Sequence, residues 1–197
     1  MNRQIHYRPM CLQDVPAVSS LHMKSLTEGL LYDMGEKYIR LFHEVSLKSK
    51  NSYGFVALNH DQIIGAALCS KNIHALPGKV MCHPIFLLGL CVRFFRLKKL
   101  YPTFGKSPVP YEFTFFFIDK DYHNLYVALN LINLVDKYFL EYGINSYTLQ
   151  VKETNKTAIL LYEYVGFNKY AEVGSGHSKR IIYIRDIVFH SRPKLIR

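Results

Sequence analysis

Residues 111–167 read YEFTFFFIDKDYHNLYVALNLINLVDKYFLEYGINSYTLQVKETNKTAILLYEYVGF and begin with two hydrophobic patterns of different period. Phe113 to Ile118 form a nearly continuous apolar run rich in aromatic residues, which is typical of a strand covered on both faces. Apolar residues then recur at helical spacing up to Gly143, which suits a left-handed helix end; they are Ala128, Leu131, Ile132, Val135, Phe139 and Tyr142. This part predicts a strand followed by an amphipathic helix.

The same order repeats in the rest of this stretch. Ser146 to Val151 predict a second strand. Asn155 suits the N-cap of a second helix, which passes through Tyr162 and closes at Gly166. Residues 111–167 therefore predict strand, helix, strand, helix.

The remaining segments predict a mixed sheet. Phe167 to Val173 and Lys179 to Val188 predict strands, because the intervening Gly174-Ser175-Gly176 is a hairpin signal. Upstream, the pattern predicts a strand, two helices and a hairpin, with Pro16 in the first turn of the first helix; these segments are Ile5 to Arg8, Leu12 to Thr27, Gly35 to Ser49, and Tyr53 to Leu58 with Ile63 to Ser70. The expected fold class is α/β, a mixed central sheet flanked by helices.

Composition favours a single domain over residues 1–197. The chain is 49% hydrophobic, long enough to bury one core, and free of repeats and low-complexity linkers. Its first residues lack the apolar segment of a cleavable signal, and its four cysteines lack disulfide-framework or zinc spacing. The nine histidines contain no close pair that suggests a metal site. We expect a cytoplasmic protein without a metal.

The sequence is basic, with a formal net charge of +10. Such a balance attracts polyanions, whether nucleic acid, anionic lipid or the phosphates of a cofactor. No zinc-finger spacing, aromatic ribonucleoprotein motif or lysine-rich block accompanies the charge, so nucleic acid is not an expected partner.

Residues 77–105 form an insertion between two predicted strands, where a simple turn is expected. Within it, Pro84 to Tyr101 begins apolar and ends basic, with Arg93, Arg96, Lys98 and Lys99. The segment is too short and charged for a membrane span, which needs about 20 largely apolar residues. Two interpretations stay open: an extra helix on the core or at a homodimer contact, and an interfacial helix on an anionic membrane.

Two motifs stand out in the second half of the chain. One consists of Asn155, Ala158, Tyr162, Gly166 and Phe167 around the second helix of the stretch. The other is the run His123-Asn124-Leu125-Tyr126-Val127-Ala128 before and into the first helix. With this order of elements, they make the chain resemble the N-acetyltransferases of the GNAT superfamily over nearly its whole length.

The first motif matches the family pattern at each of its residues, whereas the second departs from it. The family has Arg or Gln, two arbitrary residues, Gly, one arbitrary residue, and Gly or Ala. Here Ala128 is retained, His123 replaces Arg, and Tyr126 replaces the central glycine. Glycine at that place lets the backbone approach a phosphate at a helix N-terminus. Tyr126 either obstructs this approach or points outward while the amides still bind.

The resemblance implies a set of site residues. Tyr162 aligns with the tyrosine that protonates the departing coenzyme A thiolate, and Glu112 matches a position that often holds a general base. The backbone amides of the strand, at Phe116, Phe117 and Ile118, would align pantetheine and polarise the thioester. The amides at the helix start would bind the pyrophosphate; they are those of His123, Asn124, Leu125, Tyr126, Val127 and Ala128. Asn155 would contact the cofactor.

Each candidate has a purely structural alternative. Tyr162 can be a core aromatic residue, Asn155 an ordinary N-cap, and Glu112 a strand-end carboxylate that faces solvent. The chemistry nevertheless fits, because a phenol near pKa 10 can protonate a thiolate near 8.5 and a carboxylate can accept the proton of an amine.

The sequence thus predicts an N-acyltransferase that transfers an acetyl group from acetyl-coenzyme A to a small-molecule amine. The basic balance disfavours polyamines and cationic protein tails and leaves neutral or anionic amines, such as an amino sugar. Two other classes stay open: a catalytically silent GNAT-like module that binds coenzyme A, and a membrane-peripheral protein.

Overall fold

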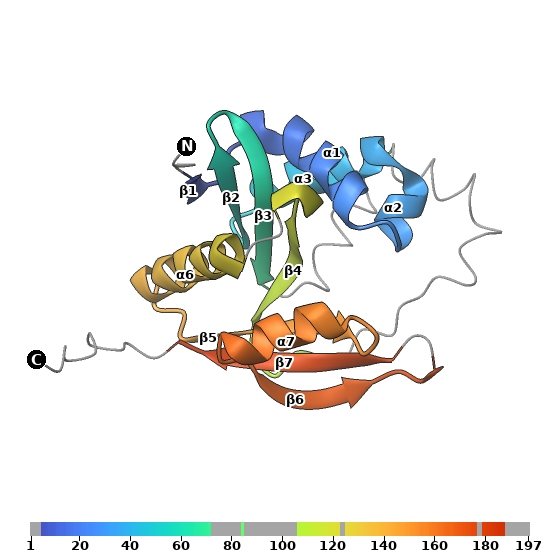
Figure 1. Cartoon of the computed structure of the whole chain (residues 1–197), viewed down its shortest axis with the longest axis vertical. Coiled ribbons are helices and arrows are strands. Elements are labelled where there is room, and N and C mark those ends of the chain that lie inside the picture. Colours follow the sequence, from blue (N-terminus) through green and yellow to red (C-terminus); the bar gives the residue numbers. More distant parts are fainter. Residues whose placement is uncertain (1–4, 72–83, 85–105, 123–124, 177–178, 188–197) are drawn as a thin grey trace, which may run out of the picture.

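The computed structural model describes residues 5–71, 84, 106–122, 125–176 and 179–187 (Figure 1). In these residues one seven-stranded sheet has the order β1-β2-β3-β4-β5-β7-β6. Its strands are β1 (Ile5–Pro9), β2 (Ser52–Asn59), β3 (Gln62–Lys71), β4 (Tyr111–Ile118), β5 (Ser146–Lys152), β6 (Asn168–Val173) and β7 (Arg180–Asp186). The helices are α1 (Val15–Ser25), α2 (Leu30–Met34), α3 (Glu36–Leu47), α6 (Leu125–Glu141) and α7 (Lys156–Tyr164), with 3-10 turns η1 (Leu12–Asp14) and η2 (Lys120–Tyr122).

The α/β class and the mixed sheet are confirmed, since only β4 and β5 are parallel and the other neighbouring strands are antiparallel. The helix expected from Leu12 begins as η1 and becomes α-helical at Val15, with Pro16 in its first turn. The pattern missed α2, which spans five residues and is too short to show a helical period. Of the insertion at 77–105 only Pro84 lies among the described residues, so its role stays a prediction.

Helices cover both faces of the sheet. On one face α1 and α3 pack on β2, β3 and β4 through Val18, Leu21, Phe42 and their strand partners. On the other face α6 and α7 share one apolar cluster with β2, β3, β4, β5 and β7. Figure 1 shows α6 and α7 as separate helices over the two halves of the sheet. None of the described helices is long and apolar enough to cross a membrane.

A buried ionic network joins α6 to the C-terminal strands. Asp136 of α6 accepts hydrogen bonds from the Tyr147 hydroxyl of β5 at 2.8 Å and from Arg185 Nη2 of β7 at 2.6 Å. The guanidinium of Arg185 also donates to the Val165 carbonyl after α7 and lies 5.6 Å from the centre of the Phe167 ring. One arginine therefore fixes α6, β7 and the end of α7 relative to one another.

A histidine pair lies inside the other face. His22 of α1 and His43 of α3 are buried, and Nδ1 of His22 lies 3.0 Å from Nε2 of His43. Both rings contact the ring of Phe115 on β4. Burial lowers the pKa of His22 to about 3, with a further contribution from His43, and burial lowers the pKa of His43 to about 4. Both rings are therefore neutral in the folded protein near pH 7.

This pair predicts a loss of stability in mild acid. Below pH 6.5 the unfolded chain protonates these histidines while the folded chain does not, so the free energy of unfolding should fall from pH 6.5 toward pH 4. The slope contributed by each histidine should approach about 1.4 kcal/mol per pH unit. Urea unfolding across this range should give a shallower slope for His43→Gln than for the wild type. The exposed His6→Gln variant should keep the wild-type slope; equal slopes for all three proteins would contradict this account.

Candidate functional site between strands β4 and β5

The parallel strands β4 and β5 pair over only two residue pairs. These pairs are Glu112 with Thr148 and Phe113 with Leu149. Beyond them the strands diverge, and Figure 1 shows β2 to β4 and β5 to β7 running in different directions. The chain continues toward α6 after the carboxyl end of β4 and toward α7 after that of β5. In open α/β sheets, ligands bind in such a crevice outside the carboxyl ends of the strands.

A β-bulge lies on β4 where the divergence begins. Leu68 of β3 pairs with Phe115 and Cys69 pairs with Phe113, so Thr114 is an extra residue on β4. Its hydroxyl donates to the Ser70 hydroxyl of β3 at 2.9 Å. Bulges bend a strand and increase its twist. This one turns the second half of β4 away from β5.

The end of α7 fixes Tyr162 through backbone hydrogen bonds. Gly166 has a φ of 91°, and its amide donates to the Glu163 carbonyl at 3.0 Å, while the Phe167 amide donates to the Tyr162 carbonyl at 2.9 Å. This is a Schellman motif, in which the residue after the glycine packs on the residue whose carbonyl it binds. The rings of Tyr162 and Phe167 accordingly lie 5.5 Å apart. The Tyr-Gly-Phe spacing in the sequence thus has a direct geometric cause.

We call the gap between β4 and β5 beyond Phe113 and Leu149 the split. Tyr162 also reaches across the split and contacts β4. Its ring centre lies 6.3 Å from that of Phe116, in an edge-to-face arrangement. The side chain is buried, and burial raises the pKa of Tyr162 above its ordinary value. The phenol therefore stays protonated at neutral pH.

Glu112 lies at the base of the split and does not face solvent, so that structural alternative is wrong. Its side chain is 2% exposed, and Oε2 has no hydrogen-bond partner among the described residues. Burial raises the pKa of Glu112 to about 7, while a hydrogen bond with Gln150 and the charge of Arg180 act in the opposite direction. A carboxylate with this pKa can accept and release a proton near neutral pH.

Other charged and polar side chains lie on the same side of the sheet as Glu112, and the sequence did not single them out. Lys152 of β5 pairs in register with Arg180 of β7, and Lys152 Nζ lies 2.6 Å from the Glu28 carboxylate after α1. Gln150 precedes Lys152 by two residues and therefore shares its face of the sheet. We call Glu28, Glu112, Gln150, Lys152 and Arg180 the polar cluster. The alternation of Thr148, Gln150 and Lys152 marked a polar strand face, but only the sheet register brings Arg180 to it.

The start of α6 packs against the end of β4. Val127 and Ala128 are buried against Ile118, whereas Leu125 and Tyr126 are 48% and 61% exposed. Tyr126 lies near Tyr7 of β1. The pKa of Tyr7 is raised mainly by burial and, to a smaller extent, by the electrostatic effect of Tyr126. The Tyr126 side chain is thus placed toward β1, on the exposed side of the helix. His123 and Asn124 lie outside the described residues.

An ion pair holds the turn between β4 and α6. Lys24 Nζ of α1 lies 2.9 Å and 3.1 Å from the two carboxylate oxygens of Asp119, and Asp119 Oδ1 accepts from the Asp121 amide at 3.2 Å. The Asp119 amide donates to the Ile64 carbonyl of β3 at 2.7 Å. These contacts position the chain that enters α6.

The other sequence candidates have identifiable structural roles. Asn155 is the N-cap of α7, because its Oδ1 accepts from the Ala158 amide at 3.2 Å. Phe116 faces Tyr162, but the Phe117 side chain belongs to the opposite face, where its ring lies 5.1 Å from that of His22. The Phe117 side chain therefore does not face Tyr162.

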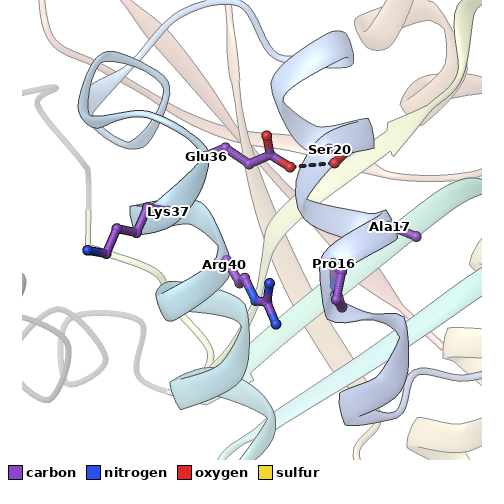
Figure 2. A pocket seen from close by; sticks show the side chains of 6 residues that line it. All are labelled: Pro16, Ala17, Ser20, Glu36, Lys37 and Arg40. Atoms are coloured by element: carbon purple, nitrogen blue, oxygen red, sulfur yellow. Dashed lines mark hydrogen bonds between the residues drawn. The ribbon is translucent and has the colours of Figure 1, made fainter.

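An open pocket lies elsewhere, between the exposed sides of α1 and α3. Figure 2 shows its lining residues, Pro16, Ala17, Ser20, Glu36, Lys37 and Arg40. The Ser20 hydroxyl donates to the Glu36 carboxylate across it. None of these six residues belongs to the split or the polar cluster. In the part of the chain that is described, no group of three or more His, Cys, Asp or Glu residues is placed to hold a metal ion.

Comparisons with known proteins give one family and one fold. A model of the acetyltransferase (GNAT) family matches residues 16–167. No curated protein sequence matches the chain significantly. Solved structures similar to the chain include the ribosomal-protein-S18-alanine N-acetyltransferase of Escherichia coli, at 14% identity over 98% of this chain and 99% of that chain, with a TM-score of 0.63.

Two further structures come from species of Thermoplasma. Ard1 from Thermoplasma volcanium is 18% identical over 93% of this chain and 98% of that chain, with a TM-score of 0.62. The PaiA N-acetyltransferase from Thermoplasma acidophilum, solved in complex with coenzyme A, is 12% identical over 93% and 99% of the two chains, with a TM-score of 0.62. At these identities the likeness shows the fold.

The burial of Glu112 predicts that ionisation of its carboxyl group lowers the free energy of unfolding. Its pKa of about 7 exceeds the ordinary 4.5, so the folded protein loses stability as pH rises from 4.5 to 7. Glu112→Gln should therefore raise the free energy of unfolding at pH 8 by up to roughly 3 kcal/mol, with little gain at pH 4.5. Urea unfolding at both pH values measures this difference. Glu141→Gln, at the exposed end of α6, is the control. Destabilisation by Glu112→Gln at pH 8 would show that the carboxylate is well accommodated.

Proposed function

The chain belongs to the acetyltransferase (GNAT) family, and we propose that it transfers an acetyl group from acetyl-coenzyme A directly to a small-molecule amine. The carrying observation is the split between β4 and β5, which has a buried carboxylate at its base and a protonated tyrosine against its β4 edge. Family membership supports acyl transfer in general. The residue roles and the acceptor below are our proposal.

Glu112 is the proposed base. An aliphatic amine near pKa 10 is mostly protonated at pH 7, so it must lose a proton before its nitrogen can attack a thioester. Oε2 of Glu112 is buried and has no described hydrogen-bond partner, so it can accept this proton directly or through water. The new C–N bond then forms as the C–S bond breaks.

Tyr162 is the proposed acid. The departing thiolate, with an ordinary pKa near 8.5, needs a proton, and a phenol of higher pKa gives one up only when such a base forms beside it. The Schellman motif and the contact with Phe116 hold the Tyr162 ring at the split. Solvent restores the phenol proton, and the products are an N-acetylated amine and coenzyme A thiol.

Backbone groups are proposed to hold the cofactor. Past Phe113, β4 has no partner on its β5 side among the described residues, so alternate amides from Thr114 to Ile118 point toward the gap. Such amides can bind pantetheine and the thioester carbonyl oxygen. The first four amides of α6 lack intrahelical acceptors, which suits the pyrophosphate. Asn155 retains its capping role in this arrangement, and a contact with the cofactor is a further proposal.

The proposed function predicts, first, that acetyl-coenzyme A stabilises the protein. At about 100 times its Kd it should add about 2.7 kcal/mol, which raises Tm by several degrees. Because the Tyr126 side chain lies toward Tyr7, Tyr126→Ala should change Kd by less than about threefold. Thermal unfolding and calorimetry measure both quantities. The absence of a shift at millimolar cofactor would favour a silent module, and much tighter binding by Tyr126→Ala would show that Tyr126 obstructs the site.

The second prediction tests the acid. Tyr162→Phe removes only the hydroxyl, and a general acid contributes about a hundredfold or more, so kcat should fall by that order while Kd for acetyl-coenzyme A changes little. Release of coenzyme A thiol, with an acceptor found by screening amines, measures turnover. Tyr164→Phe is the matched control, since Tyr164 lies on the same helix and is 69% exposed. Full turnover by Tyr162→Phe would remove this tyrosine from the mechanism.

A further inference from the structure

The sheet register places two cations on the same face of the sheet as the carboxylate at the base of the split. Glu112 pairs with Thr148, and two further steps of two residues along β5 lead through Gln150 to Lys152, which pairs with Arg180. Side chains two residues apart on a strand lie on one face, and directly paired residues share that face. The flanking Val151 and Ile181 belong to the apolar cluster on the opposite face. The polar cluster therefore lies on the face opposite α7.

The charges of this cluster are not balanced during the reaction. Glu28 contacts Lys152 at 2.6 Å, and the carboxylates that act on Arg180 are Glu28 and Glu112. Arg180 is partly buried, and this burial lowers the pKa of Arg180 while the two carboxylates raise it. When Glu112 takes a proton from the acceptor, it becomes neutral. Arg180 then keeps Glu28 but loses Glu112 as a counter-charge, and this loss is unfavourable for a partly buried cation.

We propose that the acceptor carries an anionic group, a carboxylate or a phosphate, which binds Arg180 and Lys152 while its amine lies at Glu112. Such an acceptor supplies the counter-charge that Glu112 gives up. The planar guanidinium of arginine carries five N–H donors and binds carboxylates and phosphates through two parallel hydrogen bonds. A polyamine would instead bring further positive charge to Lys152 and Arg180. Arg180 is thus a specificity-determining residue, and this inference rests on the proposed acetyl transfer to an amine.

The test compares matched acceptors with wild-type protein and acetyl-coenzyme A. The pairs are glycine and glycinamide, alanine and alaninamide, and an amino-sugar phosphate and the free amino sugar, with spermidine as the cationic member. We expect the anionic member of at least one pair to have the higher kcat/KM by about tenfold or more, the effect of a charge-assisted hydrogen bond. The amino-acid and sugar pairs distinguish a carboxylate from a phosphate.

Variants then assign the preference to its residues. Arg180→Gln should reduce kcat/KM for the anionic acceptor at least about tenfold, mainly through KM, and change that for its neutral partner less than about threefold. Lys152→Gln should act in the same direction. Lys179→Gln is the matched control, because Lys179 is the preceding cation but pairs with Glu153 and Glu172 outside the cluster. Unchanged Tm shifts with acetyl-coenzyme A verify that each variant is folded.

Several results would overturn the inference. They are acetylation of none of the anionic amines, a preference for the neutral or cationic members, or an equal effect of Arg180→Gln on both members of a pair. Acetylation of glycinamide or spermidine alone would leave the proposed function standing and reject this acceptor class. A protein that does not bind acetyl-coenzyme A would reject the proposed function as well.

Discussion

The early divergence of β4 from β5 is the constraint on which the site depends. A parallel ladder that continued along both strands would satisfy their backbone groups and close the space between them. Here the ladder stops after Phe113 and Leu149, and the bulge at Thr114 turns β4 away. The backbone edge of β4, the Tyr162 ring and the Glu112 carboxylate all owe their position to this short pairing.

A divided sheet needs other contacts to hold its halves together. On the α7 face, the Asp136–Arg185 ion pair and the Tyr147 hydroxyl link α6 to β5 and β7, and Arg185 also binds the Val165 carbonyl. Around them, the aromatic rings of Phe113, Phe167 and Tyr147 pack edge to face or tilted. The apolar cluster on the α7 face thus contains residues from the strands on both sides of the split. It holds the two halves of the sheet together although β4 and β5 do not pair beyond Phe113 and Leu149.

The two proposed proton-transfer groups are both buried, with opposite chemical results. Burial raises the pKa of a carboxylate toward neutrality, which turns Glu112 into a base that works near pH 7. Burial raises the pKa of a phenol away from neutrality, which keeps Tyr162 a proton donor. The same desolvation therefore prepares one residue to accept a proton and the other to donate one. Its cost appears at Glu112, where a carboxylate oxygen is buried without a described partner.

The sequence by itself determined the order of strands and helices, the caps at Asn155 and Gly166, and the family, because these depend on hydrophobic period and on local backbone geometry. A five-residue α2 and the bulge at Thr114 left no periodic signal. Only the tertiary structure decided that Glu112 is buried rather than exposed, that Phe117 faces away from Tyr162, and that Arg180 lies beside Lys152. Burial, strand face and charge proximity are set by the register between strands that are distant in the sequence, and no local pattern encodes that register.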